Sequence, residues 1–208
     1  SAGMTAAVRA ASKGLKVLVV EKANKIGGTS ATSGGVTWIP NHGLDTDDSS
    51  EQAMTYVKAV ANGPISEERV DAFLDTGPKM IAFLKEIGMK PVSMPWPDYF
   101  PEAPGARADR SVVFPMYDGR RLRNLFPLMR EQFTRFKLMN RYAMDFMEAN
   151  TISTRSPGWK RTLAKVMGRY WLDFSTRKLT RRDRLMTLGG ALIGPLIEQF
   201  VKLDGELR

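Results

Sequence analysis

The residues with the clearest chemical potential form a run rich in glycine and hydroxyl side chains, Gly27–Gly35. Four glycines and four Ser or Thr residues fall within its nine positions. Glycines allow the backbone to approach a ligand closely, and the run offers many N–H and O–H donors. It follows a strand-like stretch that ends at Glu21. A loop of this composition after a strand favours phosphate binding, the alternative being an ordinary glycine-rich turn.

Glu21 adds a second candidate contact, at the end of the predicted strand. An acidic side chain at this position of a nucleotide-binding fold accepts hydrogen bonds from the ribose hydroxyls of an adenine nucleotide. The alternative is a solvated charge at a strand end. Followed by Gly27–Gly35, the carboxylate favours the ligand interpretation.

The elements that must position these residues begin with an alanine-rich helix over 5–14, for which Gly14 provides a left-handed end. The β-branched run 16–21 is typical of a buried parallel strand. Together they form the second half of a βαβ unit, and Ser1-Ala2-Gly3 fits the last three positions of a Gly-x-Gly-x-x-Gly loop. We therefore expect the chain to begin inside that motif and to be a fragment.

Composition excludes several classes of site. The 208 residues are 43% apolar and 25% charged, which is typical of a globular protein. Cysteine is absent and His42 is the single histidine, so disulfides, zinc–thiolate sites and a Cys nucleophile are excluded and a Ser-His-Asp triad is disfavoured. We predict no metal site. The apolar stretch 188–203 is too short and too polar to span a bilayer.

Further helices are predicted by caps and breakers. Ser49 or Ser50 caps a helix that Gly63-Pro64 ends, and Ser66 caps the next. Pro78 is expected to open a separate helix that Gly88 stops. A last helix begins at Gly189-Gly190 and covers 191–203, and 206–208 opens a strand.

Positive charge is concentrated between positions 120 and 184. This segment holds seventeen Lys or Arg residues against five Asp or Glu, whereas the whole chain has a net charge of +9. Aromatic residues lie among the cations at mostly helical spacing. One interpretation is a helical hairpin with its aromatic face packed inward and its cations solvated. The other is contact with an anionic membrane surface or an acidic substrate tail, and nucleic acid is not expected as a partner.

Several stretches resemble a known family. They look like the N-terminal FAD-binding segment of the fumarate reductase/succinate dehydrogenase flavoprotein superfamily, and within it the chain most resembles the 3-ketosteroid Δ1-dehydrogenases. The stretches that carry the resemblance are Ala2–Met4, Val19–Lys22, Gly27–Gly35, Trp38–Asn41, Trp96–Gly105 and Gly189–Leu196. Between 124 and 184 the likeness is loose, and Pro195 stands where the family usually has a polar residue.

The resemblance implies FAD as the cofactor and assigns residues to it. Glu21 would bind the adenosine ribose, and the glycine-hydroxyl run would bind the pyrophosphate and approach the isoalloxazine ring. The implied cofactor-binding residues are Ala2, Gly3, Glu21, Lys22, Gly28, Thr29, Ser30, Ser33, Gly34 and Gly35.

Tyr99 is the implied catalytic residue, in the proline-rich loop 91–105. The tyrosine at this motif position belongs to the active site of the ketosteroid dehydrogenases. A phenol, with an ordinary pKa of about 10, can act as a hydrogen-bond acid or a proton acceptor beside a carbonyl. The alternative is a half-buried tyrosine that closes the loop.

These inferences combine into one expected architecture. It is α/β, with a Rossmann-like FAD-binding domain (1–63 and 185–208), incomplete at both ends, and a mostly helical insertion (64–184). The complete protein is expected to be an FAD-dependent dehydrogenase of a steroid-like ketone, in the cytoplasm with peripheral membrane contact through 120–184. The 208 residues alone are expected to bind FAD weakly and to be inactive.

Two alternatives stay open at this point. One is a fumarate-reductase-like enzyme that acts on a small dicarboxylate, whose key residues would lie after Arg208. The other is a non-catalytic, basic membrane- or partner-binding module. The sequence leaves the electron acceptor undefined.

Overall fold

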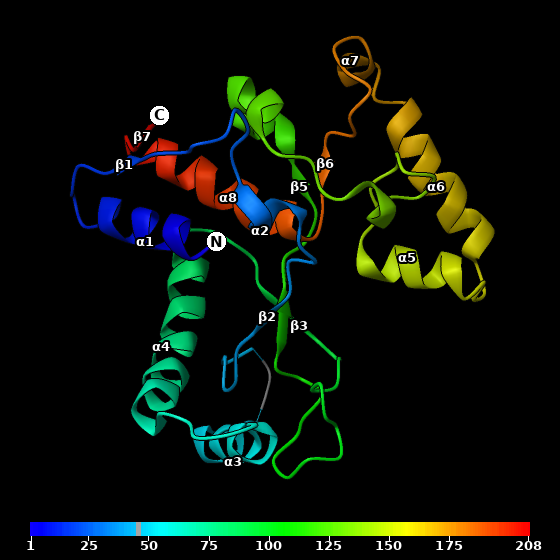
Figure 1. The fold of residues 1–208 in the computed structure, drawn as a ribbon. Helices are drawn as coiled ribbons and strands as arrows, with labels where there is room; N and C mark the ends of the chain where they lie inside the picture. The colour runs from blue at the N-terminus through cyan, green and yellow to red at the C-terminus, as the bar shows by residue number, and fades with distance from the viewer. Residues whose placement is uncertain (45–46) are drawn as a thin grey trace. The chain divides into compact units, whose positions relative to one another are not determined.

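The computed structural model describes residues 1–44 and 47–208. The chain forms two compact units, which we describe separately (Figure 1). Unit 1 contains Ser1–Gly35 and Pro115–Arg208, and unit 2 contains Val36–Phe114. No helix in the described part of the chain is both long enough and apolar enough to cross a membrane.

Unit 1 is organised around its last helix. The elements of this unit, in chain order, are α1 (Ala2–Ala11), β1 (Leu18–Val19), α2 (Gly28–Thr32), β5 (Tyr117–Asp118), the 3₁₀ segments η1 (Gly119–Leu128) and η2 (Thr134–Phe136), α5 (Phe146–Ser153), α6 (Trp159–Trp171), α7 (Phe174–Arg177), β6 (Leu185–Met186), α8 (Gly189–Lys202) and β7 (Glu206–Leu207). The predicted first helix, last helix and last strand are all present, and Gly14 adopts the expected positive φ of 80°.

Helix α8 forms the core of unit 1 because it is apolar on nearly all sides. Its buried residues include Ile193, Leu196, Ile197 and Phe200. It packs against α1 and α2, which flank it in Figure 1. The approach to α2 requires glycine, since a Cβ on Gly189 would lie 1.8 Å from the carbonyl oxygen of Ser30.

The strands of unit 1 are short. Strand β1 pairs in parallel with β7, and β5 pairs antiparallel with β6. The predicted parallel strand over 16–21 is therefore present, but the strand itself covers two residues and is not buried: Leu18 and Val20 are 48% and 72% exposed. The β-branched run favours extended backbone, which is why the strand forms. Burial of the strand depends on which other elements cover it, and the run does not determine that.

The basic segment contains a helical hairpin of α5 and α6. Tyr142, Val166 and Tyr170 form its small buried core. A capping box between Asp145 and Glu148 starts α5. The carboxylate of Glu148 also forms an ion pair with the guanidinium of Arg169 in α6, with an N–O distance of 3.0 Å. Ion pairs and caps thus supplement a small apolar core.

The prediction of an inward aromatic face is correct only in part. Phe126 and Tyr170 are buried, as expected. Other aromatic side chains of the segment lie at the surface, with exposed fractions between 38% and 66%: Phe133, Phe136, Phe146, Trp171 and Phe174. Phe133, Phe136 and Phe174 lie outside the α5–α6 hairpin. The hairpin itself has one inner face, so it leaves Phe146 and Trp171 at the surface.

Unit 2 combines two helices with a three-stranded antiparallel sheet of order β2-β4-β3. Its elements are β2 (Thr37–Trp38), α3 (Ser50–Val60), α4 (Glu67–Glu86), β3 (Val92–Met94) and β4 (Ser111–Val113). The Ser49 cap is confirmed, because its side chain accepts a hydrogen bond from the backbone N–H of Gln52.

The expected helix boundary at Pro78 is wrong. Helix α4 runs through Pro78 without a break and ends near Gly88, whose φ is 84°. Proline removes one hydrogen bond from a helix interior. Burial of Leu74, Ile81 and Leu84 on the same helix offsets that loss.

The predicted division into an FAD-binding domain (1–63 and 185–208) and an insertion (64–184) stays a prediction, and the two compact units are bounded elsewhere. Thr37 and Trp38 pair with β4, so the chain enters unit 2 at position 36. The basic segment belongs to unit 1, because β5 pairs with β6 and η1 packs on α8.

Candidate cofactor-binding site

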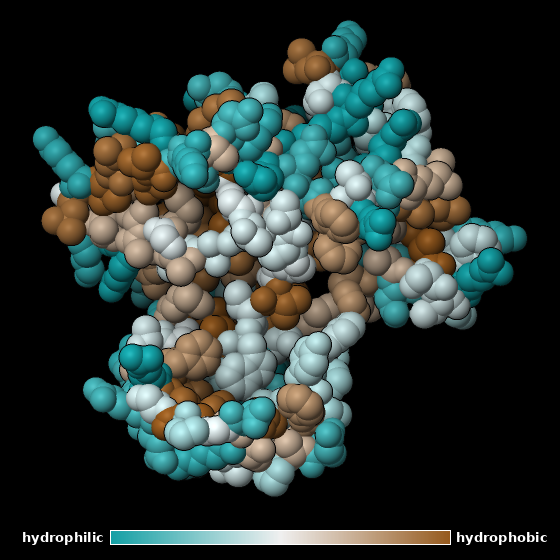
Figure 2. All heavy atoms as spheres, viewed as in Figure 1, coloured by the Kyte–Doolittle hydropathy of each residue, from teal (hydrophilic) through white to brown (hydrophobic). Residues whose placement is uncertain are grey.

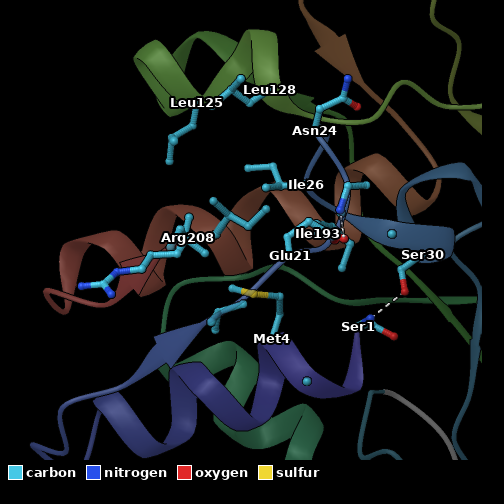
Figure 3. Close-up of a pocket in the computed structure, with 17 residues that line it drawn as sticks. Ser1, Met4, Glu21, Asn24, Ile26, Ser30, Leu125, Leu128, Ile193 and Arg208 are labelled. Atoms are coloured by element: carbon cyan, nitrogen blue, oxygen red, sulfur yellow. Dashed lines mark hydrogen bonds between the residues drawn. The ribbon is translucent and has the colours of Figure 1, made fainter.

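A cavity of about 430 Å³ lies within unit 1 (Figure 3). It is formed by the start of α1, the end of β1, the turn into α2, and parts of η1, α8 and β7. The residues that line it are Ser1, Gly3, Met4, Val19, Glu21, Ala23, Asn24, Ile26, Gly27, Gly28, Ser30, Leu125, Leu128, Ile193, Ile197, Leu207 and Arg208.

The turn into α2 brings backbone to the cavity wall. Gly27 and Gly28 have φ values of 111° and 54°, which L side chains rarely adopt. A Cβ on Gly28 would meet no atom within 4 Å, and the same holds for Gly3. A side chain at either position would therefore extend into open space beside the cavity rather than into packed protein.

Glu21 stands at the carboxyl end of β1 and is partly buried. Its Oε1 accepts a hydrogen bond of 3.0 Å from the backbone N–H of Ala23, and its own N–H donates to the carbonyl of Arg208. These bonds fix the position of the carboxylate at the cavity. An ionised carboxylate has about four lone-pair sites, so it can accept further hydrogen bonds there.

The remaining wall is apolar. Ile193 and Ile197 come from one face of α8, and Leu125 and Leu128 come from η1, across the cavity from Met4 in Figure 3. The cavity thus combines a carboxylate, a glycine turn and an aliphatic wall.

Tyr99 belongs to unit 2 and is 93% exposed. Its ring lies 5.9 Å from that of Phe100, which is 48% exposed. The backbone N–H of Phe100 donates to the hydroxyl of buried Tyr56 at 3.1 Å. The loop around Tyr99 is therefore anchored to α3 while it presents aromatic rings to solvent.

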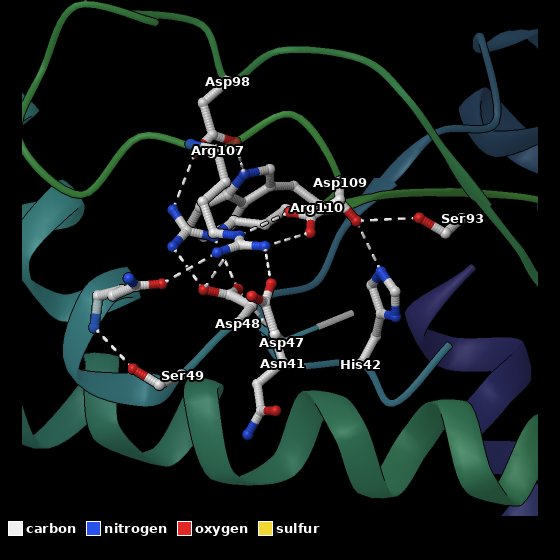
Figure 4. Close-up of polar contacts among 12 residues, drawn as sticks. Asn41, His42, Asp47, Asp48, Ser49, Ser93, Asp98, Arg107, Asp109 and Arg110 are labelled. Carbon is white, nitrogen blue, oxygen red and sulfur yellow. Dashed lines mark hydrogen bonds and ion pairs between the residues drawn. The ribbon is translucent and has the colours of Figure 1, made fainter. Parts of the chain in front are cut away.

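A buried ionic cluster holds the same loop (Figure 4). Arg110 is 1% exposed and forms 2.8 Å ion pairs with both Asp48 and Asp98. Asp98, next to Tyr99, also accepts a hydrogen bond of 2.7 Å from the indole N–H of Trp38. Burial tends to raise the pKa of Asp48, but its hydrogen bonds with Arg110 and with backbone N–H groups, together with the positive charge of Arg110, outweigh burial and keep that pKa below the usual range.

Residues 1–204 match the family described as FAD binding domain. The chain belongs to this family. FAD is therefore its cofactor, and the predicted α/β fold of an FAD-binding domain is confirmed.

The names of individual relatives are more specific than the description of the family. The chain is 37% identical over 209 residues to a 3-oxosteroid 1-dehydrogenase of Comamonas testosteroni, a match that covers 97% of this chain and 36% of that protein. It is also 37% identical over 205 residues to a 3-oxosteroid 1-dehydrogenase of Mycobacterium tuberculosis, with coverage of 94% and 35%. The chain thus spans about a third of the length of these relatives.

A solved structure is similar over nearly the whole chain. It is the 3-ketosteroid delta1-dehydrogenase from Sterolibacterium denitrificans in complex with 1,4-androstadiene-3,17-dione. The TM-score is 0.89 and the identity is 36%, over 98% of this chain and 37% of that one.

The cavity in this FAD-binding domain fits part of the cofactor. The open space beside Gly3 and Gly28 leaves room for backbone contacts to the pyrophosphate, and Glu21 supplies an acceptor for ribose hydroxyls. The aliphatic wall suits the adenine ring. Four of the predicted cofactor residues line the cavity: Gly3, Glu21, Gly28 and Ser30.

The other predicted cofactor residues do not line this cavity. They are Ala2, Lys22, Thr29, Ser33, Gly34 and Gly35. Several of them have internal contacts, since the hydroxyl of Ser33 donates to the carbonyl of Ser30 at 2.8 Å and accepts from the N–H of Gly35 at 3.1 Å. A Cβ on Gly35 would lie 2.2 Å from the carbonyl carbon of Leu188, so this glycine permits α2 to pack on α8.

Sequence reasoning missed the aliphatic wall. Ile193 and Ile197 are spaced four residues apart, a helical signal that indicates packing rather than ligand binding. Leu125 and Leu128 lie about a hundred residues after the glycine run. Their place at the cavity follows from how η1 folds back onto Lys25 and Ile26.

Proposed function

We propose that the complete protein is an FAD-dependent dehydrogenase that removes two hydrogens from adjacent carbons beside the ketone of a steroid-like substrate. The observation that supports this most is the likeness across the chain to named 3-oxosteroid 1-dehydrogenases, together with the solved relative that holds a steroid dienone. These names favour a cyclic ketone over a small dicarboxylate. They also favour an enzyme over a non-catalytic module.

In this proposal, the residues of unit 1 hold the cofactor. Glu21 accepts hydrogen bonds from the ribose hydroxyls, the turn at Gly27 and Gly28 lets the backbone approach the pyrophosphate, and Ser30 offers a hydroxyl beside it. Leu125, Leu128 and the α8 isoleucines exclude water from the adenine ring. When bound, the flavin supplies the two-electron chemistry, because it accepts the substrate's hydrogen as a hydride.

Tyr99 is the residue of unit 2 that we assign to the substrate. Its phenol can donate a hydrogen bond to a ketone oxygen, which acidifies the neighbouring C–H, or accept that proton. The exposed position of the ring on an anchored loop supports a role in contact with a bound molecule. Phe100, about half exposed, supplies apolar surface beside it, and Trp96 of the same loop is exposed to a similar extent.

The experiment that tests this function uses the complete purified protein. Its visible spectrum should show bound flavin, and denaturation should release FAD. A 3-ketosteroid should then drive reduction of an artificial dye, whereas fumarate should not reoxidise the reduced flavin. Absence of flavin would refute both enzyme interpretations, and fumarate turnover without steroid turnover would favour the dicarboxylate.

We also propose that the α6–α7 region contacts an anionic membrane surface. Large hydrophobic side chains are exposed there, namely Trp171 (50%), Leu172 (72%), Phe174 (66%) and Leu179 (87%). Lys178 and Arg181 lie in the same stretch and are also exposed. In Figure 2, hydrophobic and hydrophilic residues lie side by side over α7 at the top of the view. Exposed apolar groups flanked by cations suit the headgroup region of a bilayer.

Vesicle co-sedimentation tests this contact. The complete protein should sediment with vesicles that contain phosphatidylserine and remain in solution with phosphatidylcholine alone. Leu172→Glu should abolish sedimentation, and Val36→Glu, which changes an exposed aliphatic residue in unit 2, should not. Equal behaviour of the two variants would contradict the assignment.

A further inference from the structure

In the turn Phe126–Met129, at the end of η1, every backbone carbonyl accepts a hydrogen bond. The carbonyls of Phe126 and Met129 both accept hydrogen bonds from Nη1 of Arg182, at 3.1 and 2.8 Å. The carbonyl of Pro127 accepts from Nζ of Lys25 at 2.5 Å, and that of Leu128 accepts from the N–H of Ile26 at 2.9 Å. Four consecutive carbonyls are thus fixed by three residues.

The residues that donate these hydrogen bonds come from two different parts of unit 1. Lys25 and Ile26 directly precede the glycine turn of the cofactor cavity. Arg182 comes from the far end of the basic segment, where its guanidinium also stacks on the ring of buried Phe126 at 4.5 Å. The turn therefore connects the glycine turn of the cavity with the C-terminal end of the basic segment.

The guanidinium of Arg182 is partly buried, and burial disfavours its charged form. Burial lowers the pKa of its guanidinium, and the charge of Glu131 partly offsets that effect. A partly desolvated guanidinium is retained when its hydrogen bonds are well formed, and two carbonyl acceptors at 3.1 Å or less meet that condition. The guanidinium of Arg182 thus hydrogen-bonds to the turn and, being partly buried, is poorly placed to attract an external anion.

Leu125 and Leu128 extend from this turn into the wall of the cavity. Both residues lie in the last turns of η1, after Arg123, whose φ of 51° and ψ of −122° interrupt the helix. The N–H of Met129 closes this last turn on the carbonyls of Leu125 and Phe126. The contacts from Lys25, Ile26 and Arg182 hold the turn against the cavity.

We propose that Arg182 is a positioning residue of the FAD site, which holds the Phe126–Met129 turn so that Leu125 and Leu128 cover the adenine side of the bound cofactor. The proposal rests on the cofactor placement given above. It makes FAD affinity depend on a residue of the basic segment that lines no part of the cavity.

The test is the affinity of the complete protein for FAD after removal of its flavin. Flavin fluorescence would be titrated well below the unfolding temperature, and ADP would serve as a second probe for the adenosine half. Arg182→Ala should weaken both FAD and ADP binding by about tenfold. Arg182→Lys, which keeps a cation that can donate to both carbonyls, should recover part of that loss.

Two further variants separate positioning from a general structural role. Arg181→Ala removes the same charge from an exposed neighbour and should leave both affinities unchanged. Leu128→Ala removes a wall residue directly, and its effect should not add to that of Arg182→Ala, because both act through one contact.

Several results would overturn the proposal. Arg182→Ala could bind FAD as tightly as Arg181→Ala, or the Leu128 and Arg182 effects could add fully. A lower unfolding temperature with unchanged affinity for both probes would likewise mean that Arg182 only stabilises the fold. Wild-type protein that binds no FAD would instead refute the cofactor placement, so the two failures are distinguishable.

Discussion

Replacement of Gly28 by leucine should weaken FAD binding to the complete protein while leaving it folded. A Cβ at Gly28 meets no atom within 4 Å and Gly28 lines the cavity, so the new side chain would enter open space at the cavity wall instead of clashing with packed protein. The φ of 54° makes any L side chain costly, by about 1–2 kcal/mol of folding free energy.

Gly14 provides the matched control. It lies in the same unit, has a φ of 80°, and a Cβ at this position would likewise meet no atom within 4 Å, but Gly14 does not line the cavity. Gly14→Leu should therefore incur a similar backbone cost. The two variants should show similar falls in unfolding temperature.

The affinity for FAD should separate the two variants. Forcing extra side-chain volume into a filled site typically costs about 1–3 kcal/mol. Applied to binding, that range corresponds to about 5- to 150-fold weaker affinity. Titration of the flavin-free proteins with FAD, followed by fluorescence, measures the ratio. If Gly28→Leu and Gly14→Leu bound FAD equally well, the cavity would not be the cofactor site.

Further substitutions test the remaining contacts. Glu21→Gln keeps the shape of the side chain but loses the charge that accepts hydroxyl hydrogen bonds, so FAD affinity should fall about tenfold; equal affinity would remove Glu21 from the site. Tyr99→Phe should lower kcat on a 3-ketosteroid by about 100-fold or more while FAD stays bound, since acid–base groups typically contribute at least that much; unchanged turnover would exclude the phenol. Arg110→Ala should destabilise unit 2 by about 3–5 kcal/mol, because it removes the buried guanidinium that pairs with both Asp48 and Asp98; a urea melt measures this, and a loss below about 1 kcal/mol would show that the cluster is dispensable. The lowered pKa of Asp48 predicts that its contribution is fully present above the ordinary Asp value of about 3.9 and is lost as the pH falls below it; unfolding temperatures measured down the pH scale should decline there, and less steeply in Asp48→Asn.

The sequence predicted the polar parts of the site better than the apolar ones. Glu21, Gly28 and Ser30 line the cavity, and each belongs to a pattern that is visible locally, a carboxylate or a glycine-hydroxyl run after a strand. Their contacts with FAD stay a prediction. Leu125 and Leu128 carry no such chemical signal. Their role depends on Lys25, Ile26 and Arg182 holding a distant turn against the cavity, which local patterns do not encode.

The same limit applies to the fold. Caps and glycine stops located α1, α3 and α8 because those signals are local. Pro78 misled the helix assignment, since packing of α4 outweighs one lost hydrogen bond. The boundary at Val36 was hidden because it arises from pairing between Thr37 and Val112, which are far apart in sequence.

The central claim is that the complete protein uses FAD to dehydrogenate a ketone of the steroid type. Anaerobic mixing of the flavin-loaded protein with a saturated-ring 3-ketosteroid tests it most directly, with the visible flavin absorbance as the readout. We predict that the absorbance bleaches in proportion to the steroid added and that a ring-unsaturated product forms in equal amount. A flavin band that stays unchanged with excess steroid would contradict the account.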